Sequence, residues 1–181
     1  DDVLSGKIGI NIRPSRNSRF NIKASAGNNY AAPTFNELYW KDLGNKNLKP
    51  ERSLNLEAGL IFGFDFISDN SVEVTYTYID ARDKIVWSPN SAGLWMPANI
   101  GLSSSNVILI DANLKKQFSE SFSADLNVNY SYTSSLKKSS EYEGDPTYGK
   151  QIFYLPQELA KFNLGLIYKQ TGINIFYTFT G

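Results

Sequence analysis

The sequence of 181 residues contains no cysteine and no histidine. Without cysteine the chain can form no disulfide, thiolate metal site or cysteine nucleophile. Without histidine it lacks the commonest general base and metal ligand of proteins. Lys and Arg together number 18, as do Asp and Glu, so no basic surface for nucleic acid is indicated. We therefore predict no enzyme activity, no nucleic-acid partner, no cofactor and no bound metal.

Long hydrophobic runs are also missing. No stretch of about 18 apolar residues is present, which excludes a membrane-spanning helix. A transmembrane β-strand, by contrast, needs only about ten residues of alternating polarity. Aromatic residues make up 14% of the chain, with 11 Tyr and 11 Phe, and they favour strands and amphipathic interfaces. The composition is therefore compatible with a membrane protein built from strands.

Polar and apolar residues alternate with a period of two along most of the chain. The clearest segment is 121–133, and 54–66 and 72–78 repeat the pattern. Successive side chains of a strand point to opposite faces, so each segment has one apolar and one polar face. We predict an all-β chain of about eight strands, at residues 3–13, 19–28, 51–66, 71–82, 104–118, 121–134, 158–169 and 172–181.

The connections between these strands alternate between short and long. Short turns are expected at 14–18, 67–70, 119–120 and 170–171, and long loops without regular structure at 29–50, 83–103 and 135–157. In an antiparallel up-and-down meander, alternate connections lie at the same end, so the three long loops would emerge together. Tight turns at one end and long loops at the other are typical of transmembrane β-barrels of the outer membrane.

Aromatic residues fall at both ends of the predicted strands. Those at the tight-turn end are Phe20, Phe64, Phe66, Phe118 and Phe122, and those at the long-loop end are Tyr30, Tyr78, Tyr130 and Tyr132. Such rings suit the boundary between lipid and water, which favours a barrel with lipid outside and its polar face toward a lumen. A soluble lipocalin-like carrier of a small ligand, with its apolar side chains inward, remains an alternative, as does a passive outer-membrane barrel.

One segment carries a distinctive motif. It includes Ala31-Ala32-Pro33-Thr34-Phe35-Asn36-Glu37-Leu38-Tyr39, then Gly44-Asn45-Lys46-Asn47-Leu48-Lys49-Pro50-Glu51, and then Glu57-Ala58-Gly59. The pattern resembles the barrel of TonB-dependent outer-membrane receptors, of the vitamin B12 and siderophore receptor type. Two positions depart from the family pattern. Ala31 stands where Arg is usual, and Asn106-Val107-Ile108 stands where Gly-Val-Glu is common.

The resemblance implies a receptor and transporter in the outer membrane of a Gram-negative-type bacterium. Relatives bind a scarce nutrient, such as a ferric siderophore, haem or cobalamin, with their outer loops and a plug domain inside the barrel. The TonB complex drives import by pulling on a TonB box in the plug. Residues 1–181 would then be part of a 22-stranded barrel domain, without the TonB box, the plug and the final strands. The implied partners are outer-membrane lipid, the nutrient ligand and, through the absent plug, the TonB complex.

The motif residues have a physical interpretation, mainly as loop architecture and plug packing. Pro33 is expected to end a strand, and Pro50 to precede the next one, where a missing backbone donor does least harm. The Gly44-Asn45 pair suits a turn with left-handed backbone. Glu57 and Gly59 are expected to face the lumen.

Aromatic residues in the long loops are the candidate ligand contacts, because exposed rings stack on a corrin, porphyrin or catecholate face. The alternative is that these rings pack the loops against one another. Trp87 and Trp95 are the strongest pair, because residues 88–94 between them would form a tight loop tip. The candidates are Tyr39, Trp40, Trp87, Trp95, Tyr142 and Tyr148.

Charged residues of the third long loop are expected to be solvated. Glu141, Glu143 and Asp145 lack the spacing of a calcium-binding loop. We predict an acidic loop tip in water there, and a solubilising role for the adjacent Lys137-Lys138 pair.

Overall fold

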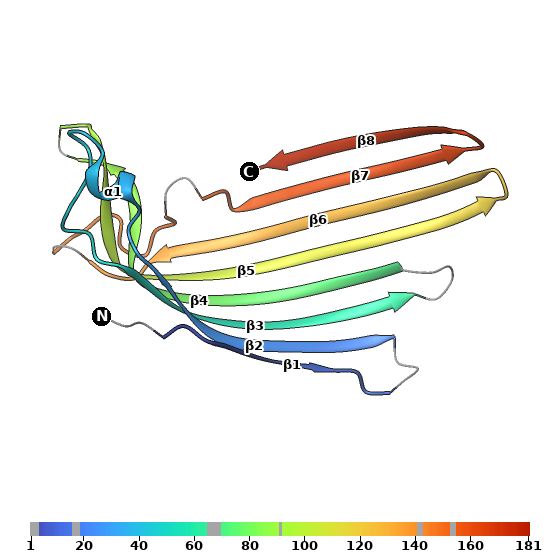
Figure 1. The fold of residues 1–181 in the computed structure, drawn as a ribbon, viewed down its shortest axis with the longest axis horizontal. Helices are drawn as coiled ribbons and strands as arrows, with labels where there is room; N and C mark the ends of the chain where they lie inside the picture. Colours follow the sequence, from blue (N-terminus) through green and yellow to red (C-terminus); the bar gives the residue numbers. More distant parts are fainter. Residues whose placement is uncertain (1–3, 16–18, 65–69, 91, 141–142, 153–154) are drawn as a thin grey trace.

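The computed structural model describes residues 4–15, 19–64, 70–90, 92–140, 143–152 and 155–181. They form one antiparallel sheet of eight strands, in which each strand pairs with the next along the chain (Figure 1). The strands are β1 (Lys7–Ile12), β2 (Phe20–Ala31), β3 (Glu51–Phe64), β4 (Asn70–Pro89), β5 (Trp95–Ser119), β6 (Phe122–Lys137), β7 (Glu158–Tyr168) and β8 (Thr171–Thr180). The predicted all-β meander is confirmed.

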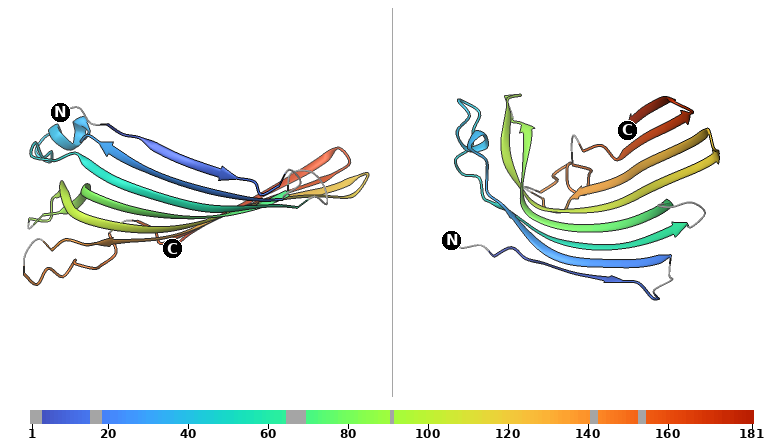
Figure 2. Two further views of the ribbon diagram at one scale, coloured as in Figure 1. Left: turned by 90° about the horizontal axis from the view of Figure 1, so that it is seen from below. Right: turned by 45° about the vertical axis from the view of Figure 1, so that its right-hand side comes forward.

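The sheet is an open, curved wall, as the two views in Figure 2 show. β1 and β8 form its two edges, and the strand order does not bring them together. The tight turns lie at one end of the wall and the long connections at the other (Figure 1). The one described helix, α1 (Phe35–Tyr39), has five residues, and no helix in the described ranges is long and apolar enough to cross a membrane.

The second long connection differs from the prediction. β4 continues to Pro89 and β5 begins at Trp95, so most of residues 83–103 are paired strand. The prediction of an irregular loop there is wrong. The alternation fails locally because Ile85, Val86 and Trp87 are consecutive apolar residues, and prolines normally count against a strand. In Figure 1 this part of β4 and β5 rises steeply at the left-hand end of the sheet.

One face of the sheet is apolar and exposed. Leu60, near the middle of β3, is 49% exposed, and its cross-strand neighbour Val74 is 41% exposed. Among the described residues, the apolar side chains that are buried are Leu48, Pro97, Ile152 and Ala160. A soluble lipocalin-like barrel would bury the Leu and Val rows in a closed, dry interior. The open sheet has no such interior, so its apolar face is available to lipid.

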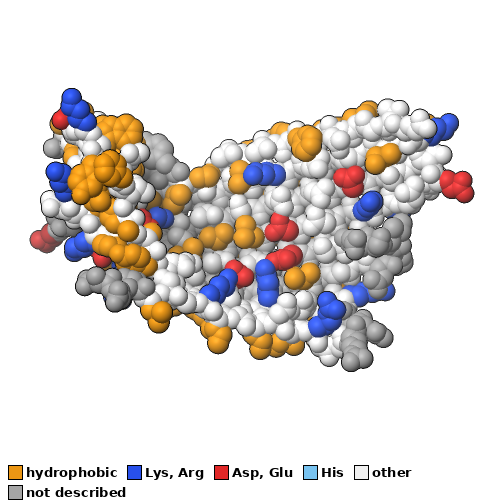
Figure 3. All heavy atoms as spheres, viewed as in Figure 1, with side chains coloured by type: hydrophobic (Ala, Val, Ile, Leu, Met, Phe, Trp, Pro, Cys, Tyr) orange, Lys and Arg blue, Asp and Glu red, His pale blue; other side chains and the backbone are white. Residues whose placement is uncertain are grey.

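The opposite face is polar and carries charges of both signs, as Figure 3 shows. Lys23 on β2 forms ion pairs with Glu73 and, at 3.9 Å, with Glu57. A Cβ atom at Gly59 would lie 2.4 Å from Cε of Lys23, so this glycine leaves room for the lysine to cross β3. Glu57 and Gly59 thus share the polar face of β3, as predicted.

Aromatic residues line the ends of the apolar face. At the tight-turn end, the rings of Phe118 and Phe122 stack with their centroids 5.2 Å apart, and the Lys116 ammonium lies 5.2 Å from the Phe118 centroid. Toward the other end, Tyr132 pairs with Glu158, the first residue of β7, and the Tyr130 hydroxyl donates a hydrogen bond of 3.4 Å to the Glu158 carboxylate. Apolar ring bodies with polar neighbours suit the two interfaces between lipid and water. The predicted Phe66 lies outside the described residues.

The two faces lead to a test by substitution. We expect Leu60→Lys, on the apolar face near mid-strand, to lower the free energy of unfolding in lipid vesicles by about 2–4 kcal/mol. The matched control is Thr77→Lys on the polar face, opposite Glu57, which should cost less than about 1 kcal/mol. Urea titration of the full-length protein in vesicles measures the change in the free energy of unfolding for both variants. Equal costs at the two positions would contradict the assignment of the faces.

Candidate ligand-binding site at the long-loop end

Three segments meet at the long-loop end of the sheet, and we call them the long-loop cluster. They are the first loop (residues 32–50, with α1), the β4–β5 extension (residues 83–101) and the third loop (residues 138–157). Figure 1 shows α1 beside the raised part of β4 and β5. The predicted gathering of the long connections at one end is therefore confirmed.

The first loop begins with a capped helix. β2 ends at Ala31 before Pro33, as predicted, and Thr34 is the N-cap of α1. Its hydroxyl accepts a hydrogen bond of 3.3 Å from the Glu37 backbone N–H, and the Glu37 carboxylate accepts one of 2.7 Å from the Thr34 backbone N–H. This reciprocal capping box satisfies two backbone donors at the start of the helix. Thr34 and Glu37 of the family motif thus shape the loop itself.

The Gly44-Asn45 pair then anchors the loop to the extension. The Asn45 backbone N–H donates to the Glu37 carbonyl at 2.7 Å, and its side-chain amide donates to the Pro97 carbonyl at 3.1 Å. A Cβ atom at Gly44 would lie 2.7 Å from the Leu38 carbonyl oxygen, so only glycine fits this approach. The predicted left-handed backbone is wrong for this pair, because it occurs at Asp42, where φ is 64°.

Asn99 of β5 joins the first loop to the bend in β4. Its side chain accepts a hydrogen bond of 2.8 Å from the Lys49 backbone N–H and donates one of 2.9 Å to the Lys49 carbonyl. It also donates to the Asp83 carbonyl at 2.6 Å, where the positive φ of 54° marks the bend. Glu51, just after Pro50, accepts a hydrogen bond of 2.6 Å from the Ile85 backbone N–H. The end of the motif therefore holds the extension in place.

The structure brings two of the predicted ligand contacts together. The Trp40 ring meets the Trp87 ring edge to face, with centroids 6.2 Å apart and an interplanar angle of 75°. Trp40 is 53% exposed. Tyr39 lies under the Lys46 ammonium, which is 5.6 Å from the ring centroid. The first loop and the extension thus share an aromatic surface that is open to solvent.

The other candidates take different positions. Trp95 begins β5 opposite Pro89, and Tyr148 lies in the third loop with 56% of its surface exposed. Tyr142 lies outside the described residues. Trp40 and Trp87 are therefore the two candidates whose rings touch. The sequence does not reveal this contact because the two residues lie far apart along the chain.

A cleft of about 290 Å³ lies between the extension and the third loop. Its lining combines apolar side chains with a small group of polar ones, which is the usual character of a ligand pocket. The apolar part includes Val86, Trp87, Ile100 and Ile152, and the polar part includes Lys137, Asp145, Thr147 and Gln151. Trp87 is the residue common to the aromatic surface and the cleft.

A buried ion pair forms one wall of the cleft. Lys137 Nζ lies 3.0 Å from Asp145 Oδ2, with side-chain exposures of 10% and 2%, and donates to Thr147 Oγ1 at 3.0 Å. Asp145 also accepts hydrogen bonds from the Thr147 backbone N–H and hydroxyl. The predicted solvated roles are wrong for Lys137 and Asp145, because the third loop folds back over the end of β6. Lys138 and Glu143 are exposed as predicted, and Glu141 lies outside the described residues.

Gln151 supplies an unused donor in the same wall. Its carbonyl oxygen accepts a hydrogen bond of 2.9 Å from the Ser135 backbone N–H. Its side-chain nitrogen is buried and has no hydrogen-bond partner in the described part of the chain. Leaving a buried donor unpaired is costly. Nothing in the sequence around Gln151 marks this buried amide, whose position depends on the folding of the third loop.

Comparison with known proteins decides the family. The model of the family "TonB dependent receptor-like, beta-barrel" matches residues 1–181. The chain belongs to the TonB-dependent receptor family. It is thus a segment of a Gram-negative outer-membrane β-barrel, in a family of receptors and transporters and not of enzymes, as the sequence predicts.

Two similar relatives are vitamin B12 transporters named BtuB. The protein from Photobacterium profundum is 30% identical over 168 residues, which cover 91% of this chain and 25% of that protein. The protein from Vibrio vulnificus is 36% identical over 118 residues, or 62% of this chain and 18% of that protein. An iron-regulated outer membrane virulence protein of Vibrio cholerae is 26% identical over 162 residues, which cover 79% of this chain and 24% of that protein. The chain therefore spans about a fifth to a quarter of these relatives.

Solved structures show the same fold. The siderophore receptor PirA of Pseudomonas aeruginosa superposes with a TM-score of 0.62 at 16% identity, covering 98% of this chain and 33% of that one. The copper transporter OprC superposes with a TM-score of 0.68 at 14% identity, covering 96% and 26%. At such low identity these likenesses establish the arrangement of strands and not the ligand.

The close approach at Gly44 can be tested directly. We expect Gly44→Ala to open the first loop internally, because the added methyl group meets backbone atoms of Leu38 and Trp40 in the same loop. The local opening free energy should fall by about 1–3 kcal/mol, seen as faster hydrogen exchange at the Asn45 amide. In the control, Gly6→Ala, the new Cβ has no atom within 4 Å. Equal exchange in both variants would contradict the need for glycine at this close approach.

Because Lys137 and Asp145 form a buried ion pair, we expect the effects of substituting them on the free energy of unfolding to be strongly non-additive. Lys137→Met alone leaves the Asp145 carboxylate buried without its cation and should lower stability by about 3–5 kcal/mol. The double variant Lys137→Met, Asp145→Leu removes both charges and should recover most of that loss. Denaturant unfolding of the full-length protein gives the four free energies. Additive single effects would show that the pair is not coupled.

Proposed function

We propose that the protein imports a scarce nutrient across the outer membrane, with a corrinoid as the first candidate and ferric siderophores and haem as the others. The observation that carries this proposal is the 30% identity over 91% of the chain to a vitamin B12 transporter. The second BtuB relative supports the corrinoid, and the iron-regulated relative keeps the iron ligands in the comparison.

The long-loop cluster suits a large planar ligand. The rings of Trp40 and Trp87 offer an exposed aromatic surface of the kind that stacks on a macrocycle. The adjacent cleft, at about 290 Å³, is at the small end of the range for drug-sized ligands. We infer that the macrocycle rests on the aromatic surface and that one of its side groups enters the cleft beside Trp87.

We further propose that this chain supplies only part of the transporter. The chain spans about a quarter of the Photobacterium relative. The sheet has two unpaired edges, which a complete barrel would close with further strands. A plug inside the barrel and the TonB complex beneath it would then provide energy coupling, and the polar face with Lys23, Glu57 and Glu73 would line the space around the plug.

The ligand class and the role of Trp87 are tested together. The full-length protein in detergent is titrated with cyanocobalamin, haemin, and ferric catecholate and hydroxamate siderophores by equilibrium dialysis. We expect tight binding of cyanocobalamin, and about tenfold weaker binding after Trp87→Ala because a stacking surface is lost. The control is Phe118→Ala, an exposed ring at the tight-turn end, which should leave the affinity unchanged.

Two results would overturn the proposal. If none of these ligands binds, the protein is not a receptor for these nutrients. If cyanocobalamin binds equally well to the Trp87→Ala and Phe118→Ala variants, the long-loop cluster is not the contact surface.

A further inference from the structure

Two arginines lie side by side on the apolar face of the sheet at its long-loop end. Arg52 of β3 and Arg82 of β4 are direct cross-strand partners, and both are exposed. The next pair toward the middle of this face is Leu54 with Asp80, and the one after it is Leu56 with Tyr78. The arginines therefore lie where the apolar band ends, at the depth expected for lipid headgroups.

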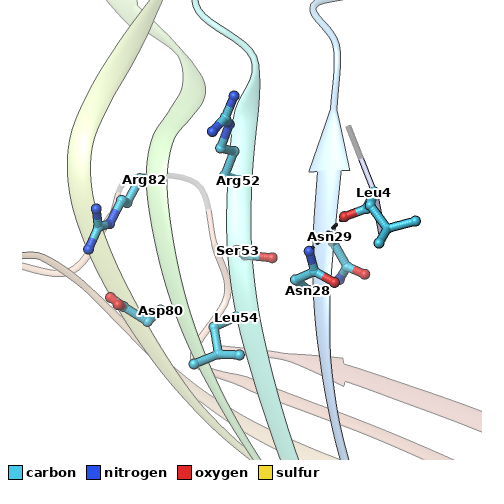
Figure 4. Close-up of a pocket in the computed structure, with 8 residues that line it drawn as sticks. All are labelled: Leu4, Asn28, Asn29, Arg52, Ser53, Leu54, Asp80 and Arg82. Atoms are coloured by element: carbon cyan, nitrogen blue, oxygen red, sulfur yellow. Dashed lines mark hydrogen bonds between the residues drawn. The ribbon is translucent and has the colours of Figure 1, made fainter. Parts of the chain in front are cut away.

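Neither arginine has an ion-pair partner in the described part of the chain. No ion pair or side-chain hydrogen bond engages either guanidinium group there, and the nearby Asp80 carboxylate forms no ion pair with them. Like charges directly opposite each other on neighbouring strands repel. Figure 4 shows the two guanidinium groups extending in different directions from their strands. An anion bound beside them would offset the repulsion.

The arginines border a hollow of about 510 Å³. Leu4 and Leu54 contribute apolar surface, and the Asn28 side chain contributes polar surface on the same face (Figure 4). Asn29 and Ser53 border the hollow through the backbone, since strand alternation places their side chains on the opposite face. Asp80 is the acidic residue of the lining, so the two arginines leave a net charge of +1. The hollow thus combines positive charge with an apolar floor on the side of the sheet that faces lipid.

We propose that this hollow binds the phosphorylated headgroup of a membrane lipid in the outer leaflet. Arg presents a planar fork of donors that matches the oxygens of a phosphate group, and such charge-assisted hydrogen bonds are the stronger ones. Leu4 and Leu54 would contact the start of an acyl chain. A free anion would use the arginines but not the apolar floor, which favours a lipid. This site is on the opposite face from the lumen and does not depend on which nutrient is imported.

The test counts lipids bound to the full-length protein. Detergent-purified protein is titrated with lipid A, a phosphorylated glycolipid, and bound lipid is measured by native mass spectrometry. We expect Arg52→Gln or Arg82→Gln to weaken binding about tenfold each, because each removes a charge-assisted contact. The control is Lys116→Gln with Lys169→Gln, two cations beside the aromatic rings of the tight-turn end, which should leave this binding unchanged.

A second arm distinguishes a lipid from a free anion. Inorganic phosphate at millimolar concentration should not displace lipid A, because it makes no contact with the apolar floor. The proposal fails if phosphate displaces the lipid, if the double variant Arg52→Gln, Arg82→Gln binds lipid A like the parent, or if the Lys116 and Lys169 control loses binding equally. The strand signal in circular dichroism shows that each variant is folded.

Discussion

The contrast between lipid on one face of the sheet and water on the other is the constraint on which this structure depends. Each strand must place apolar side chains on every second position, and each backbone group must pair with a neighbouring strand because hydrocarbon offers no partner. The register keeps Leu56, Leu60 and Phe62 on one face, while Glu57 and Gly59 share the other. The ion pairs of Lys23 are compatible with this arrangement because they form on the wet face.

Beyond the part of the sheet that faces lipid, β4 and β5 continue as a hairpin that supports the first loop. β4 and β5 continue beyond Asp83 as an extension, and the first loop is fastened to it through Asn99 and Asn45. The family motif thus fastens the first loop to the extension at the place where Trp40 and Trp87 meet. We propose that this fastening serves ligand binding, because contacts held in place lose less entropy when a ligand binds.

The sequence predicted those features that depend on local alternation, and it failed where distant segments interact. The number of strands, their order and the polarity of the two sheet faces follow from the alternation of polar and apolar residues. Contact with lipid on one face requires this alternation along each strand. The extension was missed because Ile85, Val86 and Trp87 are consecutive apolar residues that break that period. The Lys137–Asp145 pair was missed because a charged loop looks solvated until the loop is seen to fold back. The Gln151 donor depends on the same fold.

The most direct test of the account is a scan of β3 for contact with lipid. Since the chain has no cysteine, single cysteines at positions 54–62 give unique labelling sites within it. Spin labels there, in the full-length protein in bilayers, are exposed to oxygen, which concentrates in lipid, and to a water-soluble nickel chelate. The account predicts that oxygen accessibility is high at even positions and nickel accessibility is high at odd ones. Uniformly low oxygen accessibility at the even positions would contradict it.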